Sequence, residues 1–295
     1  MDMKAIAMGL VFAFMWSSAF SSARVIVAEA PALAALALRF TLSGLLAVAI
    51  AAALGQTWRL TRAQWKATVI FGVCQNALYL GLFFVAMQTI EASLAAIVAS
   101  SMPLLVAAAA WVGRGERLAP QAVIGLMAGL AGVALILGTR ATGGADPFGM
   151  ALCVVGVLAL TVATLSVRSA ASGGNVLMIV GLQMLIGSAV LWGPVATLGI
   201  PAFDLSPRLI LAFVYTLLVP GLAATFVWFL LVNRIGATRA ATFHFLNPVF
   251  GVAIAAVVLD EKIRALDMLG VVIVTLGILA VQLSKAPKST VAPRS

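Results

Sequence analysis

The chain has 295 residues, of which 63% are hydrophobic and 9% are charged, and its mean hydropathy is +1.17. A soluble domain carries about 25% charged residues, so this chain has too few polar side chains to cover a soluble surface, and its composition is that of an integral membrane protein. The net charge of +9 does not indicate a nucleic-acid partner, because the basic residues follow a membrane topology.

Apolar runs, most of them 18–23 residues long, follow one another along the whole chain. A bilayer core of about 30 Å is crossed by about 20 helical residues, and backbone that crosses lipid must satisfy its own hydrogen bonds. We therefore predict an all-α integral membrane fold with ten transmembrane helices. Their expected bounds are 5–27, 32–53, 67–88, 91–112, 120–138, 147–167, 175–198, 208–232, 236–259 and 265–283.

Lysine and arginine are distributed unevenly over the two sides of this topology. Of the 18 such residues, 12 fall on the side of the N-terminus, five fall on the opposite side, and Arg39 lies within a helix. The positive-inside rule then places both termini in the cytoplasm, and we expect a multi-pass protein of a bacterial-type inner (plasma) membrane. Residues 285–295 are polar and contain proline, which predicts a disordered cytoplasmic tail.

The chain also resembles itself when it is shifted by 145 residues. The alignment needs no gap from residue 84 to residue 137, and it is weak for the first two helices of each half. It superimposes Pro103 on Pro248, Glu116 on Glu261, Gly125 on Gly270, and Gly132 on Gly277. A unit of five helices is odd, so the second copy enters the membrane from the opposite side, as in many secondary transporters. We predict a first repeat over 1–140 and a second, inverted repeat over 141–284.

These features resemble a known family. Ten helices in two repeats, the segment Trp16-Ser17-Ser18-Ala19-Phe20 in the first helix, and an acidic residue after the fourth and ninth helices resemble the drug/metabolite transporter superfamily and, within it, the EamA family. The resemblance covers nearly the whole chain and extends to bacterial aromatic amino-acid exporters of the YddG type. It implies export of small metabolites by alternating access, through a cavity lined by helices 1, 3, 4, 6, 8 and 9.

No aspartate or glutamate falls at the middle of an expected helix. Proton-coupled drug antiporters usually carry a carboxylate at that depth, so either transport is uncoupled or His244 titrates, since imidazole can change charge near physiological pH. The missing carboxylate favours uncoupled facilitation of neutral zwitterions such as amino acids. A proton-coupled multidrug or metabolite antiporter is the alternative.

His244 is the one histidine of the chain and lies in the apolar stretch ATFHFLNPVF. Pro248 removes the N–H that would bond the His244 carbonyl, and Asn247 lies on the same helical face as His244. Ionisable groups inside a membrane are functional by default, so this polar face predicts part of a substrate cavity. The alternative is a histidine that caps a neighbouring helix or packs in the core.

Aromatic and polar side chains complete the expected site. Trp16 and Tyr79 lie well inside their helices rather than at the interfaces where such residues gather, and with Phe83 they are expected to wall a cavity for an apolar or aromatic group, core packing being the alternative. The expected substrate-binding residues are Trp16, Ser17, Asn76, Tyr79, Phe83, Ser100, Trp228, His244 and Asn247. Pro103 and Pro248 are expected either to act as hinges of helices 4 and 9 or only to kink them for packing.

The remaining unusual residues have structural interpretations. Arg39 either attracts a substrate carboxylate or, as its depth of about two turns favours, braces neighbouring carbonyls and extends outward. Five glycines (Gly125, Gly129, Gly132, Gly270 and Gly277) allow close packing of helices 5 and 10, with a homo-oligomer contact as a further use. An enzyme needs a nucleophile with a base or clustered metal ligands, so we expect no catalytic residue, metal or cofactor. The expected partners are a small-molecule substrate and the lipid bilayer.

Overall fold

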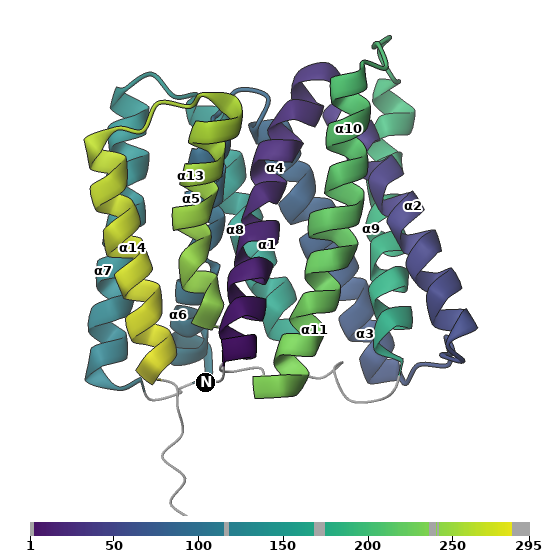
Figure 1. The fold of residues 1–295 in the computed structure, drawn as a ribbon, viewed down its shortest axis with the longest axis horizontal. Coiled ribbons are helices and arrows are strands. Elements are labelled where there is room, and N and C mark those ends of the chain that lie inside the picture. Colours follow the sequence, from purple (N-terminus) through teal and green to yellow (C-terminus); the bar gives the residue numbers. More distant parts are fainter. Residues whose placement is uncertain (1–2, 115–117, 168–174, 236–239, 241, 285–295) are drawn as a thin grey trace, which may run out of the picture.

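In the computed structural model the described residues are 3–114, 118–167, 175–235, 240 and 242–284, and the regular elements in this part of the chain are all helices (Figure 1). In chain order they are α1 (Met3–Glu29), α2 (Ala32–Ala53), α3 (Arg62–Phe71), the π-helix η1 (Gly72–Tyr79), α4 (Leu80–Ala86), α5 (Ala92–Ser100), α6 (Met102–Arg114), α7 (Pro120–Thr142), α8 (Pro147–Val167), α9 (Val176–Leu198), α10 (Pro207–Thr216), the π-helix η2 (Leu217–Ala223), α11 (Ala224–Ile235), the 3-10 helix η3 (Thr242–Leu246), α13 (Asn247–Leu259) and α14 (Ala265–Ser284).

Eight helical stretches within the described ranges are long and apolar enough to cross a membrane. Two shorter apolar stretches, 207–223 and 243–259, stand where the eighth and ninth helices were expected. The prediction of one helix over 236–259 differs from the structure, which has a 3-10 turn in η3 followed by α13. Residues 236–239 and 241, where that expected helix begins, lie outside the described residues.

Polar side chains set the start of two helices, and for the first of them hydropathy alone gives a start that is too late. Thr61 and Gln64 form a capping box, in which Thr61 Oγ1 accepts from Gln64 N at 3.2 Å and Gln64 Oε1 accepts from Thr61 N at 2.9 Å. This box satisfies two of the free N–H groups at a helix start, so α3 begins five residues before the expected position 67. At α10, Ser206 Oγ accepts from Leu209 N at 2.9 Å in the same way.

The helix boundaries recur at the offset of 145 residues that relates the two halves of the sequence. The π-helices η1 and η2 begin at residues 72 and 217, and α6 and α13 begin at residues 102 and 247. Each of α6 and α13 carries a proline in its first turn, Pro103 and Pro248, where a missing N–H costs least. The two prolines therefore lie at breaks between helical segments rather than at kinks inside one continuous helix.

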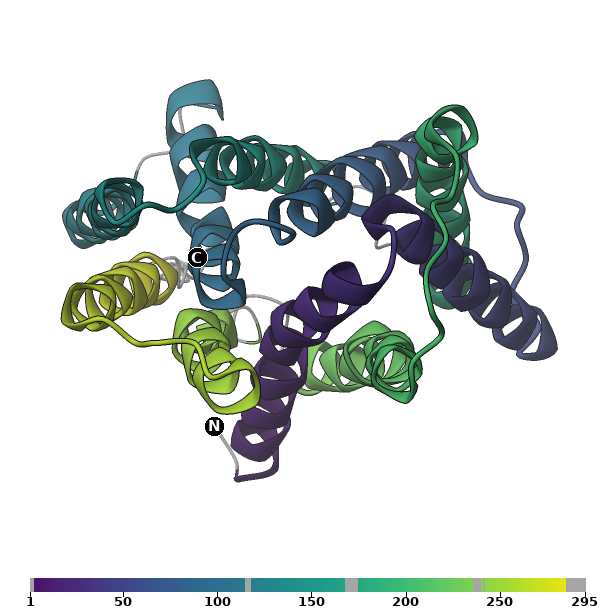
Figure 2. The same cartoon turned by 90° about the horizontal axis from the view of Figure 1, so that it is seen from above.

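Helices that correspond under this offset pack against each other at the two ends of the molecule. The α7–α14 pair lies at one end of the long axis and the α2–α9 pair at the other (Figures 1 and 2). A Cβ placed on Gly277 of α14 would lie 2.6 Å from the carbonyl oxygen of Gly125 and 2.7 Å from Cα of Gly129 in α7. This backbone-to-backbone contact confirms the close glycine packing predicted for helices 5 and 10.

The end of the bundle that is uppermost in Figure 1 is held by charged side chains. The guanidinium of Arg140 at the end of α7 pairs in bidentate fashion with Asp267 in the first turn of α14, at 3.1 and 2.7 Å, and also contacts Glu91. Glu261 accepts from the backbone N–H groups of Ala92 and Ser93 at the start of α5, at 2.7 and 3.0 Å. These bonds tie α5, α7 and the α13–α14 connection together.

Beside this cluster, Asp146 precedes α8 and accepts from Thr89 Oγ1 at 2.7 Å and from Gly149 N at 3.0 Å. The Thr89 hydrogen bond, helped by those from Gly149 and Phe148, lowers the pKa of the Asp146 carboxyl. An ionised carboxylate at this position also interacts favourably with the positive end of the α8 dipole.

Below the charged cluster, the largest apolar core fills the upper part of the bundle. It includes side chains of α1, of α4, of α5 and of the turn that joins α4 to α5, all at most 2% exposed: Ile26, Phe84, Met87, Ile90 and Leu94. Cores of this density leave no room for a ligand, so the upper end of the described bundle is closed.

Candidate substrate-binding cavity

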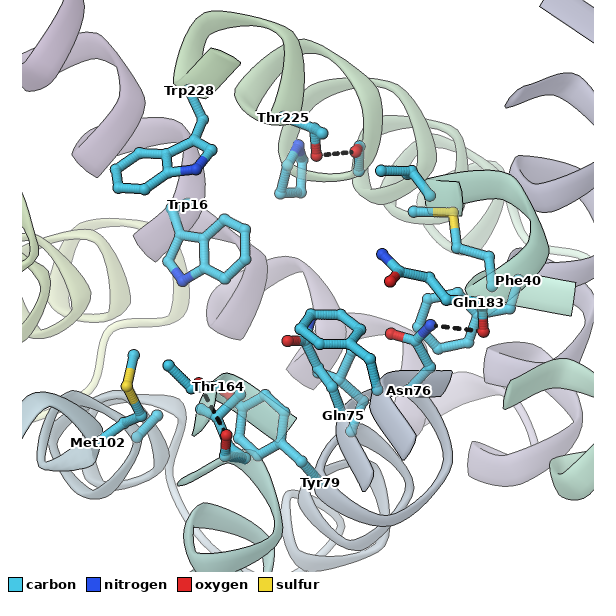
Figure 3. Close-up of a pocket in the computed structure, with 18 of the residues that line it drawn as sticks. Trp16, Phe40, Gln75, Asn76, Tyr79, Met102, Thr164, Gln183, Thr225 and Trp228 are labelled. Atoms are coloured by element: carbon cyan, nitrogen blue, oxygen red, sulfur yellow. Dashed lines mark hydrogen bonds between the residues drawn. The ribbon is translucent and has the colours of Figure 1, made fainter. Parts of the chain in front are cut away.

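A cavity of about 380 Å³ lies in the middle of the bundle (Figure 3). Its size falls within the range of roughly 300–1,000 Å³ that is usual for small-molecule sites. The lining extends from Tyr79 at mid-bundle to Thr68 in α3 and Val176 in the first turn of α9. Because α3 and α9 both begin at the lower end in Figure 1, the cavity extends towards that end and away from the closed upper end.

The helices expected to line the cavity all contribute, and two others join them. Arg39 and Phe40 of α2 and Gln183 of α9 also face the cavity, although the second and seventh predicted helices were not expected to take part. α2 and α9 pack against each other at one end of the molecule, and this pair forms one edge of the cavity.

Seven of the nine expected site residues line this cavity. They are Trp16, Asn76, Tyr79, Ser100, Trp228, His244 and Asn247. Ser17 does not, because it lies about 100° further around α1 than Trp16 and its hydroxyl donates to the Asn247 carbonyl at 3.4 Å. Phe83 lies one turn above Tyr79, at a ring distance of 4.6 Å, and lines a smaller adjoining cavity of about 60 Å³.

One side of the cavity is an aromatic corner, made of Phe12, Trp16, Trp228 and His244 (Figure 3 labels the two tryptophans). The His244 ring centroid lies 5.4 Å from Phe12, 6.3 Å from Trp16 and 5.3 Å from Trp228. The Phe12 and Trp16 rings meet the imidazole edge to face, an arrangement that aromatic pairs prefer. Such a corner accepts a flat apolar group.

The hydrogen bonds of His244 fix how its ring is presented. Its Nδ1 lies 3.0 Å from Asn247 Nδ2, and an amide nitrogen only donates, so Nδ1 accepts and the proton of a neutral ring lies on Nε2. Within the described residues, Asn247 Oδ1 is buried without a hydrogen-bond partner. The imidazole lies in the cavity wall and bonds its own helical turn rather than capping a neighbouring helix.

Amide side chains form the opposite wall, as Figure 3 shows. Asn76 Nδ2 donates to the Gln183 carbonyl at 2.9 Å, whereas the side-chain amides of Gln75 and Gln183 make no hydrogen bond to any described residue. Thr164 and Thr225 donate back to carbonyls of their own helices, each at 2.8 Å. The two glutamine amides are therefore free to bind a ligand.

Arg39 is the cavity residue that sequence reasoning interpreted least well. Its side chain is 8% exposed and lines both cavities, so the expectation that it extends outward is wrong. It shares the inward face of α2 with Leu36, Phe40 and Ser43, all at most 2% exposed, and this i, i+3, i+4 pattern was the signal that could have placed it.

Two further lining residues, Phe12 and Gln75, also lie at a helical spacing from predicted site residues. Phe12 lies four residues before Trp16, and Gln75 lies four residues before Tyr79, so each pair shares a helical face. The spacing of four residues from Trp16 and from Tyr79 is therefore the signal that could have identified Phe12 and Gln75 as lining residues.

The sequence matches a known family of transporters over nearly its whole length. The model of the EamA-like transporter family matches the chain twice, at residues 3–138 and 147–283. The chain belongs to the EamA-like transporter family. EamA proteins form part of the drug/metabolite transporter superfamily, so this chain is a multi-pass membrane transporter.

The proteins to which the chain is similar are distant in sequence but match it over most of its length. The transporter YvbV of Bacillus subtilis (strain 168), named only as an uncharacterized transporter, is 25% identical over 281 residues, covering 93% of this chain and 90% of its own. A WAT1-related chloroplastic protein of Arabidopsis thaliana is 23% identical over 275 residues, covering 90% of this chain and 66% of its own. A solved crystal structure with 21% identity covers 95% of this chain and 98% of its own at a TM-score of 0.68, which shows a shared fold.

Proposed function

We propose that this EamA transporter exports amino acids, neutral or aromatic, and related small metabolites by alternating access. The observation that carries the proposal is the central cavity, which offers an aromatic corner on one side and free glutamine amides on the other. A flat apolar side chain fits the first, and a polar amino-acid backbone fits the second. The described lining residues include no carboxylate, which disfavours cationic drugs.

The proposed architecture is ten transmembrane helices in two inverted repeats of five. Its support is the offset of 145 residues between helix boundaries and the two separate matches of the family model, which divide the chain near residue 140. The start of α1 and the end of α14 lie at the same end of the bundle (Figure 1), as an even number of crossings requires.

We further propose that the lower end in Figure 1 faces the cytoplasm of a bacterial-type inner membrane. Lys4, Arg59, Arg62 and Lys66 lie at the start of α1 and around the start of α3, both at that end. At the upper end, the basic side chains of Arg140 and Arg208 are instead paired with carboxylates, those of Asp267 and Glu29. This asymmetry agrees with the positive-inside rule, and the structure is then an inward-facing state.

In this mechanism the two proline breaks are the hinges. Pro103 and Pro248 lie in the first turns of α6 and α13; Pro103 lines the cavity, and Pro248 directly follows the cavity residue Asn247. A missing backbone hydrogen bond at such a break allows the two helical segments to move separately. Rotation there would close the cavity below and open it above.

Uncoupled facilitation is the proposed mode of transport, and proton-coupled drug or metabolite antiport is the alternative. Among the described lining residues His244 has the side-chain type that, in water, changes charge near neutral pH, and it lies in the aromatic corner without a carboxylate partner. An apolar setting favours the uncharged imidazole, which then serves as a hydrogen-bonding group.

The test is transport by the purified protein in liposomes, with a panel of labelled amino acids, with and without an imposed pH gradient. We expect neutral amino acids to move without a gradient, and His244→Ala to lower the rate. The matched control is Trp58→Ala, an exposed aromatic residue outside the cavity (72% exposed). Movement of cationic drugs alone, driven by the gradient and abolished by His244→Ala, would instead establish the antiporter.

A further inference from the structure

We infer that the cavity binds its substrate through a carboxylate group, and that Arg39 is the residue that receives it. The inference rests on the proposed transport function and deepens it, because it defines the chemical class of the substrate. Among the described residues, Arg39 is a buried cation that has no counterion.

The guanidinium of Arg39 has no anionic partner. Its side chain is 8% exposed, and it makes neither an ion pair nor a hydrogen bond with any described residue; its Nε is fully buried and unpartnered. The guanidinium lies over the ring of the adjacent Phe40, with Cζ 5.0 Å from the ring centroid. An arginine inside a membrane protein costs several kcal/mol unless it is paired or faces water, so a structural role should leave visible bonds.

The bracing role that the sequence favoured is therefore not supported. The π-helix η2 contains Pro220, which leaves a backbone carbonyl without its usual partner, and Arg39 lies close to this segment. A Cβ placed on Gly221 would lie 4.0 Å from Arg39 Nη2. Even so, the guanidinium donates to no carbonyl of the described segment.

The position of Arg39 suits ligand binding instead. It lies where the main cavity and the smaller adjoining cavity meet, and both are lined by Arg39, Gln75 and Tyr79. The Gln75 amide and the Tyr79 hydroxyl make no hydrogen bond to a described residue, so both are free to support the anion bound by Arg39. The described lining holds no carboxylate to compete for it.

The geometry favours a carboxylate over a phosphate ester. One planar guanidinium matches one carboxylate with two parallel hydrogen bonds, whereas a dianionic phosphate needs further positive charge that the described lining does not supply. The substrate is accordingly a small monoanion or zwitterion whose carboxylate binds Arg39 and whose apolar body extends towards the aromatic corner.

The inference is tested by binding to the purified full-length protein, followed by tryptophan fluorescence. Three probes share one ring: phenylalanine, 3-phenylpropionate and 2-phenylethylamine, which carry a zwitterion, a carboxylate and an ammonium. We expect the two carboxylates to bind and the amine not to bind. Arg39→Gln should weaken carboxylate binding by roughly 10- to 100-fold, the effect of losing a hydrogen bond to a charged group, and Arg39→Lys should retain part of it. Arg208→Gln, at a position that is 69% exposed, is the matched control and should change nothing.

A second measurement separates binding from a purely structural role. An unpaired buried charge destabilises a protein in the absence of its ligand, so Arg39→Met should raise Tm, and 3-phenylpropionate should raise the Tm of the natural protein but not of the variant. A lower Tm for Arg39→Met, equal binding of the amine, or unchanged carboxylate binding by Arg39→Gln would overturn the inference.

The two proposals fail in different ways. Amino-acid transport that proceeds equally well without Arg39 leaves the transport proposal intact and removes this inference. Carboxylate binding that depends on Arg39, without amino-acid transport in liposomes, does the reverse.

Discussion

At the scale of single residues, the aromatic corner depends most on Trp228. Its ring contacts both Phe12, at a centroid distance of 4.8 Å, and His244, at 5.3 Å. On that side of the cavity it therefore links α11 to α1 and to η3. A ligand ring placed in the corner would lie against this side chain.

Trp228→Ala should weaken binding of an aromatic substrate by about tenfold, because an aromatic contact and its buried area together contribute on the order of 1.4 kcal/mol or more. Binding is measured by calorimetry with the purified variant, and Trp58→Ala, exposed between α2 and α3, is the control. Equal affinities of the Trp228 variant and the natural protein would show that the corner does not contact the substrate.

A second residue-scale prediction concerns the charged cluster at the upper end. The side chains of Arg140 and Asp267 are 4% and 2% exposed, and Asp267→Asn leaves a buried guanidinium with Glu91 as its remaining anionic partner. We expect a loss of roughly 3 kcal/mol of stability, seen as a lower Tm. Arg208→Gln breaks an exposed pair with Glu29 at 3.7 Å and should cost less than about 1 kcal/mol; similar losses in both variants would contradict the assignment.

The sequence predicts a site residue well only where it also indicates whether the side chain points into the bundle. His244, Asn247 and Trp16 are unusual at their depth, and rarity alone indicates a cavity. Arg39 is equally rare, but depth along a helix does not tell which face points inward. The same limit applies to Ser17, which does not line the cavity because its neighbour Trp16 lies on the face of α1 that points into it.

At the scale of elements, glycine contacts determine how α7 and α14 pack. Gly277→Ala would place a methyl group within 2.6–2.8 Å of backbone atoms of Gly125 and Gly129, and backbone yields less readily than a side-chain end. We expect destabilisation of about 1–3 kcal/mol, measured as a lower Tm. Gly138→Ala in α7 meets nothing within 4 Å and should be neutral or slightly stabilising; a neutral Gly277→Ala would rule out the close contact.

The hinge at α13 makes a separate prediction. Pro248→Ala restores an N–H that can reach the His244 carbonyl, so the break before α13 should stiffen. The transport rate should fall about three- to tenfold, the effect of one backbone hydrogen bond, while the substrate Kd stays unchanged. Pro194→Ala, inside α9 and outside the cavity lining, is the control. A changed Kd with an unchanged rate would assign Pro248 to packing instead.

Hydropathy predicts the helices well and their internal hydrogen bonding poorly. Apolar content placed most helices within a few residues, since burial in lipid depends on composition. It could not reveal the π-helices η1 and η2 or the 3-10 turn η3, because these differ from an α-helix in hydrogen-bond register alone. Pro220 inside η2 is the exception, since a proline frees the carbonyl that a π turn accommodates.

At the scale of the whole molecule, the closed upper end and the cavity extending downwards correspond to one state of the proposed alternating-access cycle. The charged cluster of Arg140, Asp267 and Glu91, with Glu261 on the start of α5, must open for substrate to leave at the upper end. Under the proposed inverted repeat, an equivalent closure would form at the other end. Glu116, the counterpart of Glu261, lies outside the described residues.

The central claim is that one cavity is exposed to the two sides of the membrane in turn. Its most direct test replaces Cys74 and Cys153 by alanine, introduces Gln183→Cys in the cavity wall, and measures labelling by an impermeant maleimide from each side. We predict fast labelling from the cytoplasmic side without substrate, and slower labelling from the outer side that speeds up when transported substrate is present, because an uncoupled carrier also changes state when it is empty. Equally fast labelling from both sides, unchanged by substrate, would indicate an open channel, and labelling from neither side would show that this cavity is not the transport path.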